Sequence, residues 1–582
     1  MAATLLILSI AIPWFGALVV WLAGDARPRL QHGLAVAFSV LAGAVAVALL
    51  PFSSSQILLS IPVGGAFGDF TFAADGLGVF LAVVATVVGS LAVIFSVGYM
   101  RGEQQLGRYY ALVLFFIGAM VGLVLTTNLL LIFFFWEITA LCSYALISFY
   151  NDDPKAVAGG IKALIITQLG GVGLLLGALM IFSYTGSFDL RDFIAQAGNI
   201  PQTALAVMAF GFLAAAAAKS AQFPFQTWLP DAMEAPTPIS ALIHAATMVN
   251  AGVYLLVRFY PAFAEVPGWR TAVMLVGMLS ALLTAIMAMV ATDLKRALAY
   301  STVSQLGYMV YAVGAGGLFA SQFHLMSHSV FKALLFLSAG AVIHGVGTRD
   351  MRLMGGLGQK MPFTRAVFVI GALALAGLPI LNGFWSKELV LEAGLVGGPL
   401  WMWVVMLVGA GLTACYTFRM VWMVFYGQPR AKLHAHEAGA AMKTALAPLA
   451  AGTLLTWLLA GPFSKLLEST LPLHALESHS TLHYLEEVAL APATLIAMVV
   501  IALGLAAWWQ RARLQGLVNA LSGVARAAAD SFGFEAINRG IVRATQNSAE
   551  NLRVTQTGLV SWNIFGIMAG LVLVLVILLL GA

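Results

Sequence analysis

The chain has 582 residues, of which 61% are hydrophobic and only 9% are charged, and its formal net charge is +5. Soluble domains average about 45–50% apolar and about 25% charged residues, so this composition excludes a soluble protein. The mean hydropathy of +0.95 indicates a polytopic protein embedded in a lipid bilayer. The basic residues lie in short loops between apolar segments rather than in one patch, which argues against a nucleic-acid-binding protein.

The start of the chain and its two cysteines have simple interpretations. Residues 1–23 are apolar and lack a basic n-region and a small-residue cleavage site, so we interpret them as the first spanning helix rather than a signal peptide. Cys142 and Cys415 lie within apolar segments far apart in the sequence. We expect buried apolar side chains rather than a disulfide or a metal-binding pair.

Sixteen segments meet the requirement for a spanning helix, which is about 20 mostly apolar residues. We therefore predict an all-α polytopic membrane protein with about 16 transmembrane helices. The predicted spans are 2–23, 33–51, 77–99, 109–126, 128–149, 160–183, 204–226, 238–260, 270–291, 298–315, 318–343, 365–394, 398–426, 444–463, 488–509 and 558–581.

The basic residues of the loops predict the orientation of these spans. Loops after even-numbered spans carry only Arg191, Arg270, Lys465 and the less certain loop residue Arg258. The positive-inside rule then places the odd-numbered loops in the cytoplasm and both termini outside. The odd-numbered loops carry Arg27, Arg29, Arg101, Arg108, Lys155, Lys295, Arg296, Arg349, Arg352, Lys360, Arg365, Arg430, Lys432, Arg511 and Arg513.

Two stretches depart from the pattern of spans and short loops. Residues 52–76 are rich in Gly and Ser with alternating apolar positions, which predicts a small external hairpin. Residues 512–556 interleave apolar and charged positions and are too polar to span a membrane. We interpret them as amphipathic helices lying along the membrane surface, with a small cytoplasmic cap as the alternative.

Ionisable residues inside predicted spans are the main functional signal, because each costs several kcal/mol, about 2.5–3.5 on insertion scales. Glu137 lies near the middle of its span and is a candidate proton-exchanging carboxylate; a protonated or helix-packing carboxyl is the alternative. Lys219 follows a run of alanines and precedes Pro224, so we predict a broken helix there. A buried lysine at such a break can exchange protons. The alternative is a lysine whose side chain extends to the membrane interface, so that its charge stays in water.

A row of three ionisable residues lies on one face of a later span. His324, His328 and Lys332 are spaced at i, i+4 and i+8, which covers about 12 Å of helix. Two histidines four apart could hold zinc, but a third ligand is needed and the next turn offers a lysine, so we favour a proton relay. His244 is a fourth imidazole in an apolar segment and a candidate member of the relay.

A second lysine stands beside a second predicted break. Lys387 follows Pro379 and Gly383, which interrupt the apolar segment 365–394. This break is five spans after the break at Lys219, and an odd offset predicts inverted repeats with sites at the interrupted helices. The order of lysine and proline differs between the two breaks, so the repeat is imperfect.

Motifs for nucleotide, iron–sulfur or haem binding are missing from the sequence. It contains no P-loop, no GxGxxG after a strand, no CxxC cluster and no CxxCH. We therefore expect an ion-transport subunit with no cofactor, no metal and no redox or hydrolytic site of its own. Its energy would come from an ion gradient or from partner subunits.

Several blocks, in this order, resemble the antiporter-like subunits of respiratory complex I and of Mrp-type cation/proton antiporters. They are FFFWE at 133–137, AKSAQFPFQTWLPDAMEAPTPISALIHAATM at 218–248, DLKRALAYSTVSQLGYM at 293–309, HLMSHSVFKALLFL at 324–337 and GLPILNGFWSKELVLEA at 377–393. The resemblance covers nearly the whole chain, and residues 512–581 are similar to the lateral helix and last span of the complex I L subunit and the Mrp A subunit.

The resemblance implies two inverted five-helix repeats and a role for each candidate residue. Glu137 and Lys219 would form the pair of the first half-channel, and Lys387 would be the exit lysine of the second. His244, His324, His328 and Lys332 would form the central axis between them. The implied organisation is N-terminal helices with the hairpin (1–108), a first repeat (109–262), a second repeat (263–426), C-terminal helices (427–511), a lateral amphipathic helix (512–556) and a last transmembrane helix (557–582).

The function implied by the resemblance is proton translocation within a multisubunit membrane complex. Segments such as NDDPKAVAGGIKALIITQLGG resemble the Mrp A pattern, which implies exchange of protons for monovalent cations such as Na⁺. The end of the chain after the sixteenth span and Asn250, where antiporter A subunits often have lysine, depart from that pattern. The alternatives are an L-type subunit of a complex I-like oxidoreductase or membrane-bound hydrogenase, and a bicarbonate-uptake subunit. We expect a bacterial inner membrane and other membrane subunits as partners.

Overall fold

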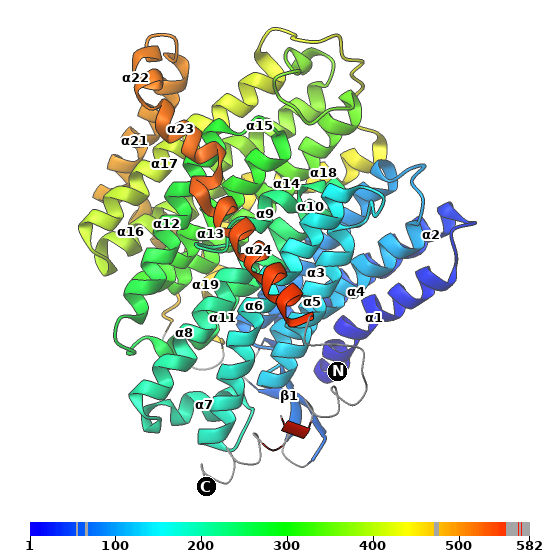
Figure 1. Cartoon of the computed structure of the whole chain (residues 1–582), viewed down its shortest axis with the longest axis vertical. Helices are drawn as coiled ribbons and strands as arrows, with labels where there is room; N and C mark the ends of the chain where they lie inside the picture. Colours follow the sequence, from blue (N-terminus) through cyan, green and yellow to red (C-terminus); the bar gives the residue numbers. More distant parts are fainter. Residues whose placement is uncertain (54–55, 65–67, 471–475, 554–567, 570–571, 573–582) are drawn as a thin grey trace. The chain divides into compact units, whose positions relative to one another are not determined.

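The fold is seen in a computed structural model that describes residues 1–53, 56–64, 68–470, 476–553, 568–569 and 572. The chain divides into two compact units, Met1–Ala525 and Arg526–Ala582. The first unit is a bundle of long helices with one small hairpin (Figure 1). This architecture confirms the predicted all-α polytopic membrane protein.

Thirteen helical spans of the described residues are long and apolar enough to cross a membrane. Three of them include a π-helical segment or a four-residue 3-10 segment. They are α10 (Thr237–Ala241), η5 (Leu242–Ala246) and α11 (Met248–Phe263); α17 (Leu400–Val421) and η7 (Trp422–Tyr426); and α18 (Ala440–Leu455), η8 (Thr456–Leu459) and α19 (Ala460–Glu468). The other ten are α1 (Ala2–Leu22), α2 (Pro28–Ala48) with η1 (Leu50–Phe52), α3 (Gly76–Tyr99), α4 (Leu106–Leu125), α5 (Leu129–Ile147), α6 (Pro154–Thr185), α8 (Gln202–Lys219), α12 (Trp269–Val290), α14 (Leu318–Val346) and α21 (Pro492–Trp509).

Three of the sixteen predicted spans differ from this set. The tenth is α13 (Leu294–Ala315), a full-length helix whose many polar side chains lower its mean hydropathy and are buried against neighbouring helices. The twelfth is divided into α15 (Pro362–Ala376) and α16 (Asn382–Gly397), at the interruption that Pro379 and Gly383 predict. The sixteenth, 558–581, falls almost wholly outside the described residues.

The predicted hairpin is present as strands β1 (Ile57–Pro62) and β2 (Asp69–Ala73), which pair antiparallel. The backbone amide of Thr127, at the start of α5, donates a 3.0 Å hydrogen bond to the carbonyl of Thr71. Asn128 forms a β-bridge with Asp189, which precedes α7 (Leu190–Gln196). Loops after the second, fourth and sixth predicted spans therefore meet at one end of the bundle, at the bottom of Figure 1. We call it the hairpin end.

Loops after the odd-numbered spans meet at the opposite end. Residues of α9 (Trp228–Asp231) and η4 (Ala232–Glu234) form ion pairs with α6, with α13 and with the loop that follows α14. This grouping confirms that the loops alternate between two ends, as the predicted spans require. Which end faces the cytoplasm stays a prediction, and so do the boundaries of the two inverted repeats.

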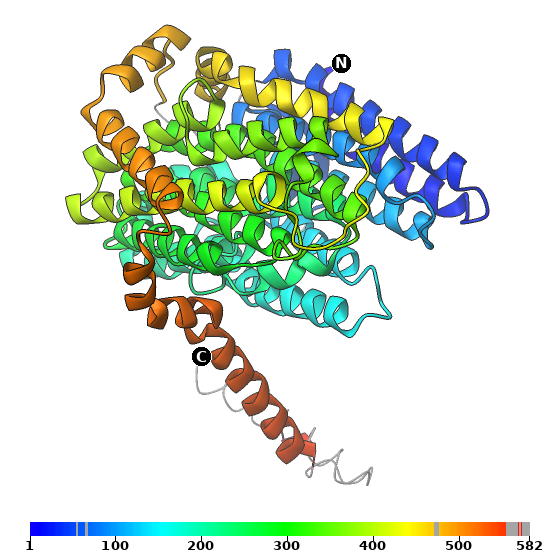
Figure 2. The same cartoon turned by 90° about the horizontal axis from the view of Figure 1, so that it is seen from above.

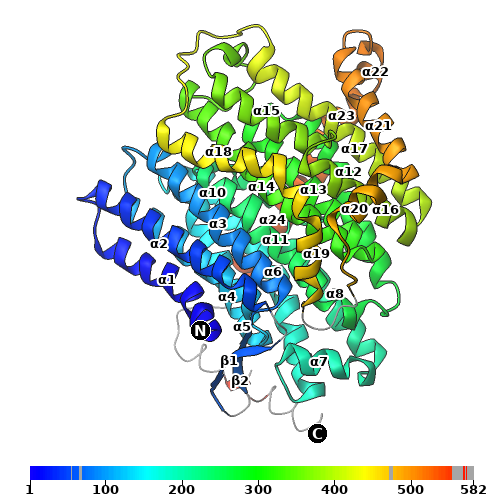
Figure 3. The same cartoon turned by 180° about the vertical axis from the view of Figure 1, so that it is seen from behind.

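Small residues bring central helices of the bundle close together. Figures 2 and 3 show the packed helices from two further sides. A Cβ atom on Gly277 of α12 would lie 2.5 Å from the carbonyl oxygen of Gly307 on α13, and one on Gly307 would lie 2.6 Å from the carbonyl of Gly277. Gly173 of α6 and Gly211 of α8 face each other in the same way. Close backbone approach of this kind is typical of helix packing in membranes.

The remaining elements connect the long helices or follow them. α20 (Thr481–Leu490) lies between α19 and α21, and α22 (Gln515–Ala520) and α23 (Ser522–Ala529) follow α21. In the second unit, α24 (Phe534–Arg553) exposes apolar side chains such as Ile537 and Ile541 together with its charged residues. Helices in the predicted region 512–556 are thus confirmed, whereas their position along a membrane surface stays a prediction.

Candidate functional site

The first helix break lies at Lys219, as its sequence context predicts. α8 ends at this residue, and the ammonium group is fully buried. Its Nζ atom donates a 2.7 Å hydrogen bond to the backbone carbonyl of Trp136 on α5 and lies 4.9 Å from the centre of the Trp136 ring. The lysine is therefore held at the break by a carbonyl dipole and an aromatic face.

Glu137, the next residue on α5, is close to Lys219 without forming a direct ion pair. Lys219 and Gln168 are the groups that act on its charge, yet neither of its carboxylate oxygens has a hydrogen-bond partner within the described residues. A Cβ atom on Gly171 of α6 would lie 2.4 Å from Glu137 Oε1, so glycine leaves the space that the carboxylate fills. The two groups that the sequence predicted as a pair are therefore electrostatic neighbours.

His244 lies in the π-helical segment η5, where a widened turn interrupts the span. Both ring nitrogens lack a hydrogen-bond partner within the described residues, and the ring stacks on Phe336 at 5.3 Å between centroids. Thr247 Oγ1 donates to the Leu242 carbonyl at 2.7 Å, and Asn250 Nδ2 donates to the Ala245 carbonyl at 2.9 Å. These two side chains satisfy carbonyls that the π turn frees.

His324, His328 and Lys332 are fully buried on α14. Lys332 Nζ donates to the Leu298 carbonyl at 3.0 Å and also to the hydroxyl of Ser301. His328 has no hydrogen-bond partner for either ring nitrogen within the described residues, and its ring centre lies 6.5 Å from that of His324. The helix face predicted to carry His324, His328 and Lys332 is therefore present on α14.

His324 connects the histidine row to the second helix break. Its Nδ1 lies 2.9 Å from Ser386 Oγ on α16, and its Nε2 lies 3.2 Å from Gln305 Oε1 on α13. Among the described residues, no group of three His, Cys, Asp or Glu side chains is placed to hold a metal ion. The neighbours of His324 are thus hydroxyl, amide and lysine groups, which suit proton transfer better than zinc binding.

The second break separates α15 from α16, and Lys387 lies on α16 just after it. Its Nζ atom donates a 2.8 Å hydrogen bond to the Leu375 carbonyl near the end of α15 and lies 5.9 Å from the centre of the Tyr308 ring. Gly383 allows this approach, because a Cβ atom there would lie 2.0 Å from the carbonyl oxygen of Ala374. Lys387 repeats the arrangement of Lys219, with a carbonyl and an aromatic ring as neighbours.

The site residues predicted from the sequence do not include three further buried charges. Lys295, predicted to lie in a loop, is 4% exposed and donates a 2.6 Å hydrogen bond to the Ala235 carbonyl. Arg258, which the sequence left open between the end of a span and a loop, lies within α11 and forms a buried ion pair with Asp75. Glu388 is 1% exposed, and neither carboxylate oxygen has a partner within the described residues. The clue to Lys295 was Asp293, whose side chain caps α13 and marks its start.

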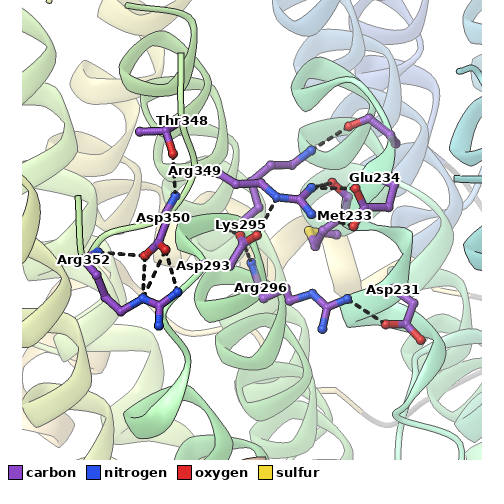
Figure 4. A network of polar contacts seen from close by, with 11 residues as sticks. Asp231, Met233, Glu234, Asp293, Lys295, Arg296, Thr348, Arg349, Asp350 and Arg352 are labelled. Carbon is purple, nitrogen blue, oxygen red and sulfur yellow. Dashed lines mark hydrogen bonds and ion pairs between the residues drawn. The ribbon is translucent and has the colours of Figure 1, made fainter. Parts of the chain in front are cut away.

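A network of ion pairs closes the end of the bundle opposite the hairpin, and Figure 4 shows it from close by. Asp231 pairs with Lys162 at 2.8 Å and with Arg296 at 3.1 Å. Arg349 donates to both carboxylate oxygens of Glu234, at 2.6 and 2.8 Å, and lies 2.6 Å from Asp293. Burial opposes the charge of Arg349, but these carboxylates outweigh it and raise the pKa of the guanidinium.

This network lies beside Lys295, which feels the charges of Arg349, Asp293 and Glu234. Lys295 in turn acts electrostatically on His244. The charged end of the bundle is therefore in electrostatic contact with the central row through one buried lysine.

Two family models match the chain. The model described as "NADH:quinone oxidoreductase/Mrp antiporter, TM" matches residues 126–413. The model described as "NADH-Ubiquinone oxidoreductase (complex I), chain 5 N-terminus" matches residues 61–110. The first match contains all seven candidate residues predicted from the sequence.

Curated proteins similar to the chain include NADH-quinone oxidoreductase subunit L of Pseudomonas aeruginosa. It is 43% identical over 423 residues, which are 68% of this chain and 68% of that protein. NAD(P)H-quinone oxidoreductase chain 5 of a Picosynechococcus species is 44% identical over 385 residues, which are 63% of this chain and 58% of that protein. The chain thus spans less than two thirds of the length of some of these relatives.

Solved structures also resemble the fold. A chain of the Mrp complex from a Dietzia species has a TM-score of 0.85 and 29% identity, over 99% of this chain and 63% of that chain. A chain of the membrane-bound sulfane sulfur reductase, an archaeal respiratory membrane complex, has a TM-score of 0.72 and 25% identity, over 80% of this chain and 96% of that chain.

Proposed function

The chain belongs to the NADH:quinone oxidoreductase/Mrp antiporter family of membrane proteins, and we propose on this basis that it is a proton-translocating subunit of a multisubunit membrane complex. One observation carries the proposal. Buried ionisable side chains form two groups of electrostatic neighbours, one at the first helix break and one that leads to the second. The first group is Glu137 with Lys219, and the second is His244, Lys332, His328, His324 and Lys387. The two groups lie on packed helices, since α8, which ends at Lys219, packs against α11, which follows the segment with His244.

The proposed mechanism moves charge rather than backbone. Lys219 carries a proton that Glu137 stabilises, and loss of that proton changes the field at the next buried group. In a low-dielectric interior each such change has a large effect on its neighbours, because water does not screen it. A proton would then pass along the histidine row to Lys387 through hydroxyls and water molecules. The complex, and not this chain alone, would supply the driving force.

The test uses the assembled complex in membrane vesicles and a pH-sensitive dye. Lys219→Ala and Glu137→Gln should each abolish most of the proton translocation, while Lys155→Ala, which removes an exposed lysine, should leave it unchanged. Co-purification of the partner subunits confirms that each variant still assembles. Normal translocation by an assembled Lys219→Ala complex would show that the mechanism is wrong.

A more specific version of this proposal is that the complex exchanges protons for Na⁺. The likeness to a chain of the Mrp complex, with a TM-score of 0.85 over 99% of this chain, supports it. Vesicles should then acidify or alkalise on addition of NaCl with no redox substrate present. The Lys387→Ala variant should abolish this response.

A second candidate is a proton-pumping subunit of a complex I-like quinone oxidoreductase. It is favoured by the 43–44% identity to quinone oxidoreductase subunits, which exceeds the 29% identity to the Mrp chain. In that case translocation should require an electron donor and a quinone, and subunits with redox centres should co-purify. The same experiments distinguish the two candidates, because the driving force differs while the residues do not.

The orientation and location belong to the same proposal. Placement of the ion-pair network in the cytoplasm of a bacterial cell, with the hairpin outside, follows from the positive-inside rule. Cysteine substitution at exposed Lys155 should then give labelling by impermeant reagents only from the cytoplasmic side.

A further inference from the structure

Three glutamates follow Lys387 toward the hairpin end of the bundle. Glu388 and Glu392 lie on α16, which runs from the second break to the loop at Gly398. Glu487 lies on α20, between α19 and α21. Both the loop after α16 and the segment with α20 follow even-numbered predicted spans, so they belong to the same end as the hairpin.

Exposure of these glutamates increases in the order of their positions. Glu388 is 1% exposed and Glu392 is half-buried, with its Oε2 atom covered by protein, while Glu487 is exposed to solvent. The buried carboxylate oxygens of Glu388 and Glu392 Oε2 have no hydrogen-bond partner within the described residues. Buried carboxylates without partners are costly, so a structural role as fixed ion pairs does not explain them.

Neighbouring members of the series act on each other electrostatically. Lys387 and Glu392 act on Glu388, and Glu487 acts on Glu392. Glu388 and Glu392 are four residues apart on one helix, a rise of about 6 Å, which one water molecule can bridge. α16 packs against both α20 and α21, and Figure 3 shows these helices side by side.

A hydroxyl from another helix provides an independent sign of a hydrated path. Thr494 of α21 is 3% exposed, and its Oγ1 has no hydrogen-bond partner within the described residues. Thr494 nevertheless acts on Glu388, and its helix α21 packs against α16. An unpartnered buried hydroxyl beside an unpartnered buried carboxylate is where a bridging water would be bound.

We propose that Glu388, Glu392 and Glu487 form the path by which a proton leaves Lys387 for the solvent at the hairpin end. The inference rests on the proposed function and extends it beyond Lys387. In each step one N–H or O–H bond breaks and one O–H bond forms: the Lys387 ammonium protonates Glu388, Glu388 protonates Glu392, Glu392 protonates Glu487, and Glu487 releases the proton to water. Thr494 is a positioning residue that holds water at Glu388.

The experiment compares single variants of the assembled complex in vesicles by dye-detected proton translocation. Glu388→Gln and Glu392→Gln should each slow translocation roughly tenfold or more, since a positioned proton-transfer group contributes at least that much. Glu486→Gln is the matched control, because Glu486 is the exposed neighbour of Glu487 on α20. It should leave the rate unchanged.

A titratable replacement separates proton transfer from a packing role. Glu392→His should restore part of the rate lost in Glu392→Gln, with a pH profile displaced from that of the parent protein, because imidazole titrates at a higher pH than a carboxyl. A purely structural role would give equal losses in both variants and an unchanged profile, which overturns the proposal.

Failure of this path is distinguishable from failure of the proposed function. If Lys387→Ala abolishes translocation while Glu388→Gln and Glu392→Gln leave it intact, then protons leave Lys387 by another route and the path is wrong. If Lys219→Ala and Lys387→Ala themselves have no effect on translocation, the proposed function fails, and the path fails with it.

Discussion

Lys219 donates its 2.7 Å hydrogen bond to the backbone carbonyl of Trp136 and not to the carboxylate of the residue that follows. The ammonium group and Glu137 therefore influence each other without a direct hydrogen bond, and Gly171 of α6 leaves space for the carboxylate. The geometry leaves the carboxylate without a fixed partner among the described residues, so its position depends on the space available to it.

Gly171→Ala should disturb the first half-channel with little loss of stability. The new Cβ atom would lie 2.4 Å from Glu137 Oε1, and the flexible carboxylate would move away. Because small displacements of reacting groups have large effects on rate, we expect proton translocation to fall roughly tenfold or more. The fall is measured as the rate of dye-detected proton translocation in vesicles. Gly33→Ala, on a helix surface with no atom within 4 Å of the new Cβ, should have no effect.

Arg258→Leu should destabilise the protein strongly. It leaves Asp75 buried at 1% exposure without its cationic partner, and breaking a buried pair in this way costs about 3–5 kcal/mol. The melting temperature of the purified protein in detergent should fall accordingly. The double variant Asp75→Asn/Arg258→Leu should recover part of the loss, because asparagine can still cap α3 and carries no charge.

The control for this pair is Arg191→Leu. The side chain of Arg191 is 40% exposed where it pairs with Asp189, so its removal should cost at most about 1 kcal/mol. Similar losses of stability for Arg258→Leu and Arg191→Leu would show that burial does not determine how much the ion pair contributes.

Arg349 and Glu234 should be energetically coupled across the end of the bundle. Arg349 donates two short hydrogen bonds to the Glu234 carboxylate, and the Glu234 side chain is only 11% exposed. A double-mutant cycle with Arg349→Ala and Glu234→Ala should give a coupling energy of about 1–3 kcal/mol by thermal unfolding. The pair Arg352–Asp350, with 67% and 28% exposure, should give less than about 1 kcal/mol.

Glu437 should make stability depend on acidic pH. Burial opposes its charge, but hydrogen bonds from the Thr364 hydroxyl and from backbone amides, including that of Phe363, outweigh burial and lower its pKa below the usual 4.5. A lowered folded-state pKa means that the stabilisation is present above the unfolded value and disappears as the pH falls through the folded value. Glu437→Gln should therefore lower the melting temperature at pH 7 and approach the parent protein below about pH 4.

Glu265→Gln is the control for Glu437, since Glu265 is an exposed loop carboxylate. Its melting temperature should follow that of the parent protein at every pH. A difference in melting temperature between Glu437→Gln and the parent protein that stays constant down to pH 3 would contradict a stabilising role of the Glu437 charge.

Helix breaks were the part of the site that the sequence predicted best. Pro224 after Lys219 and Pro379 before Lys387 each indicate an interruption, and α8 and α15 do end there. Proline and glycine act locally, so their effect can be recognised without the fold. The face shared by His324, His328 and Lys332 is equally local, because helical spacing determines it.

Features that depend on distant parts of the chain could not be predicted in this way. The π turn at His244 is stabilised by side chains that satisfy freed carbonyls, and nothing in the local sequence distinguishes it from an ordinary helix. Arg258 finds Asp75 across 183 positions of sequence. Without knowledge of the packing, a single arginine near the end of an apolar segment can belong either to the span or to the loop that follows.

The buried lysines 219, 332 and 387 share a further property through their carbonyl partners. A carbonyl oxygen accepts a hydrogen bond from a neutral amine as well as from an ammonium ion, so the contact survives when the proton departs. An ion pair with a carboxylate would instead lose its attraction at that moment. Each lysine is thus anchored independently of its charge, and a complete cycle of loading and unloading can leave all three side chains where they began.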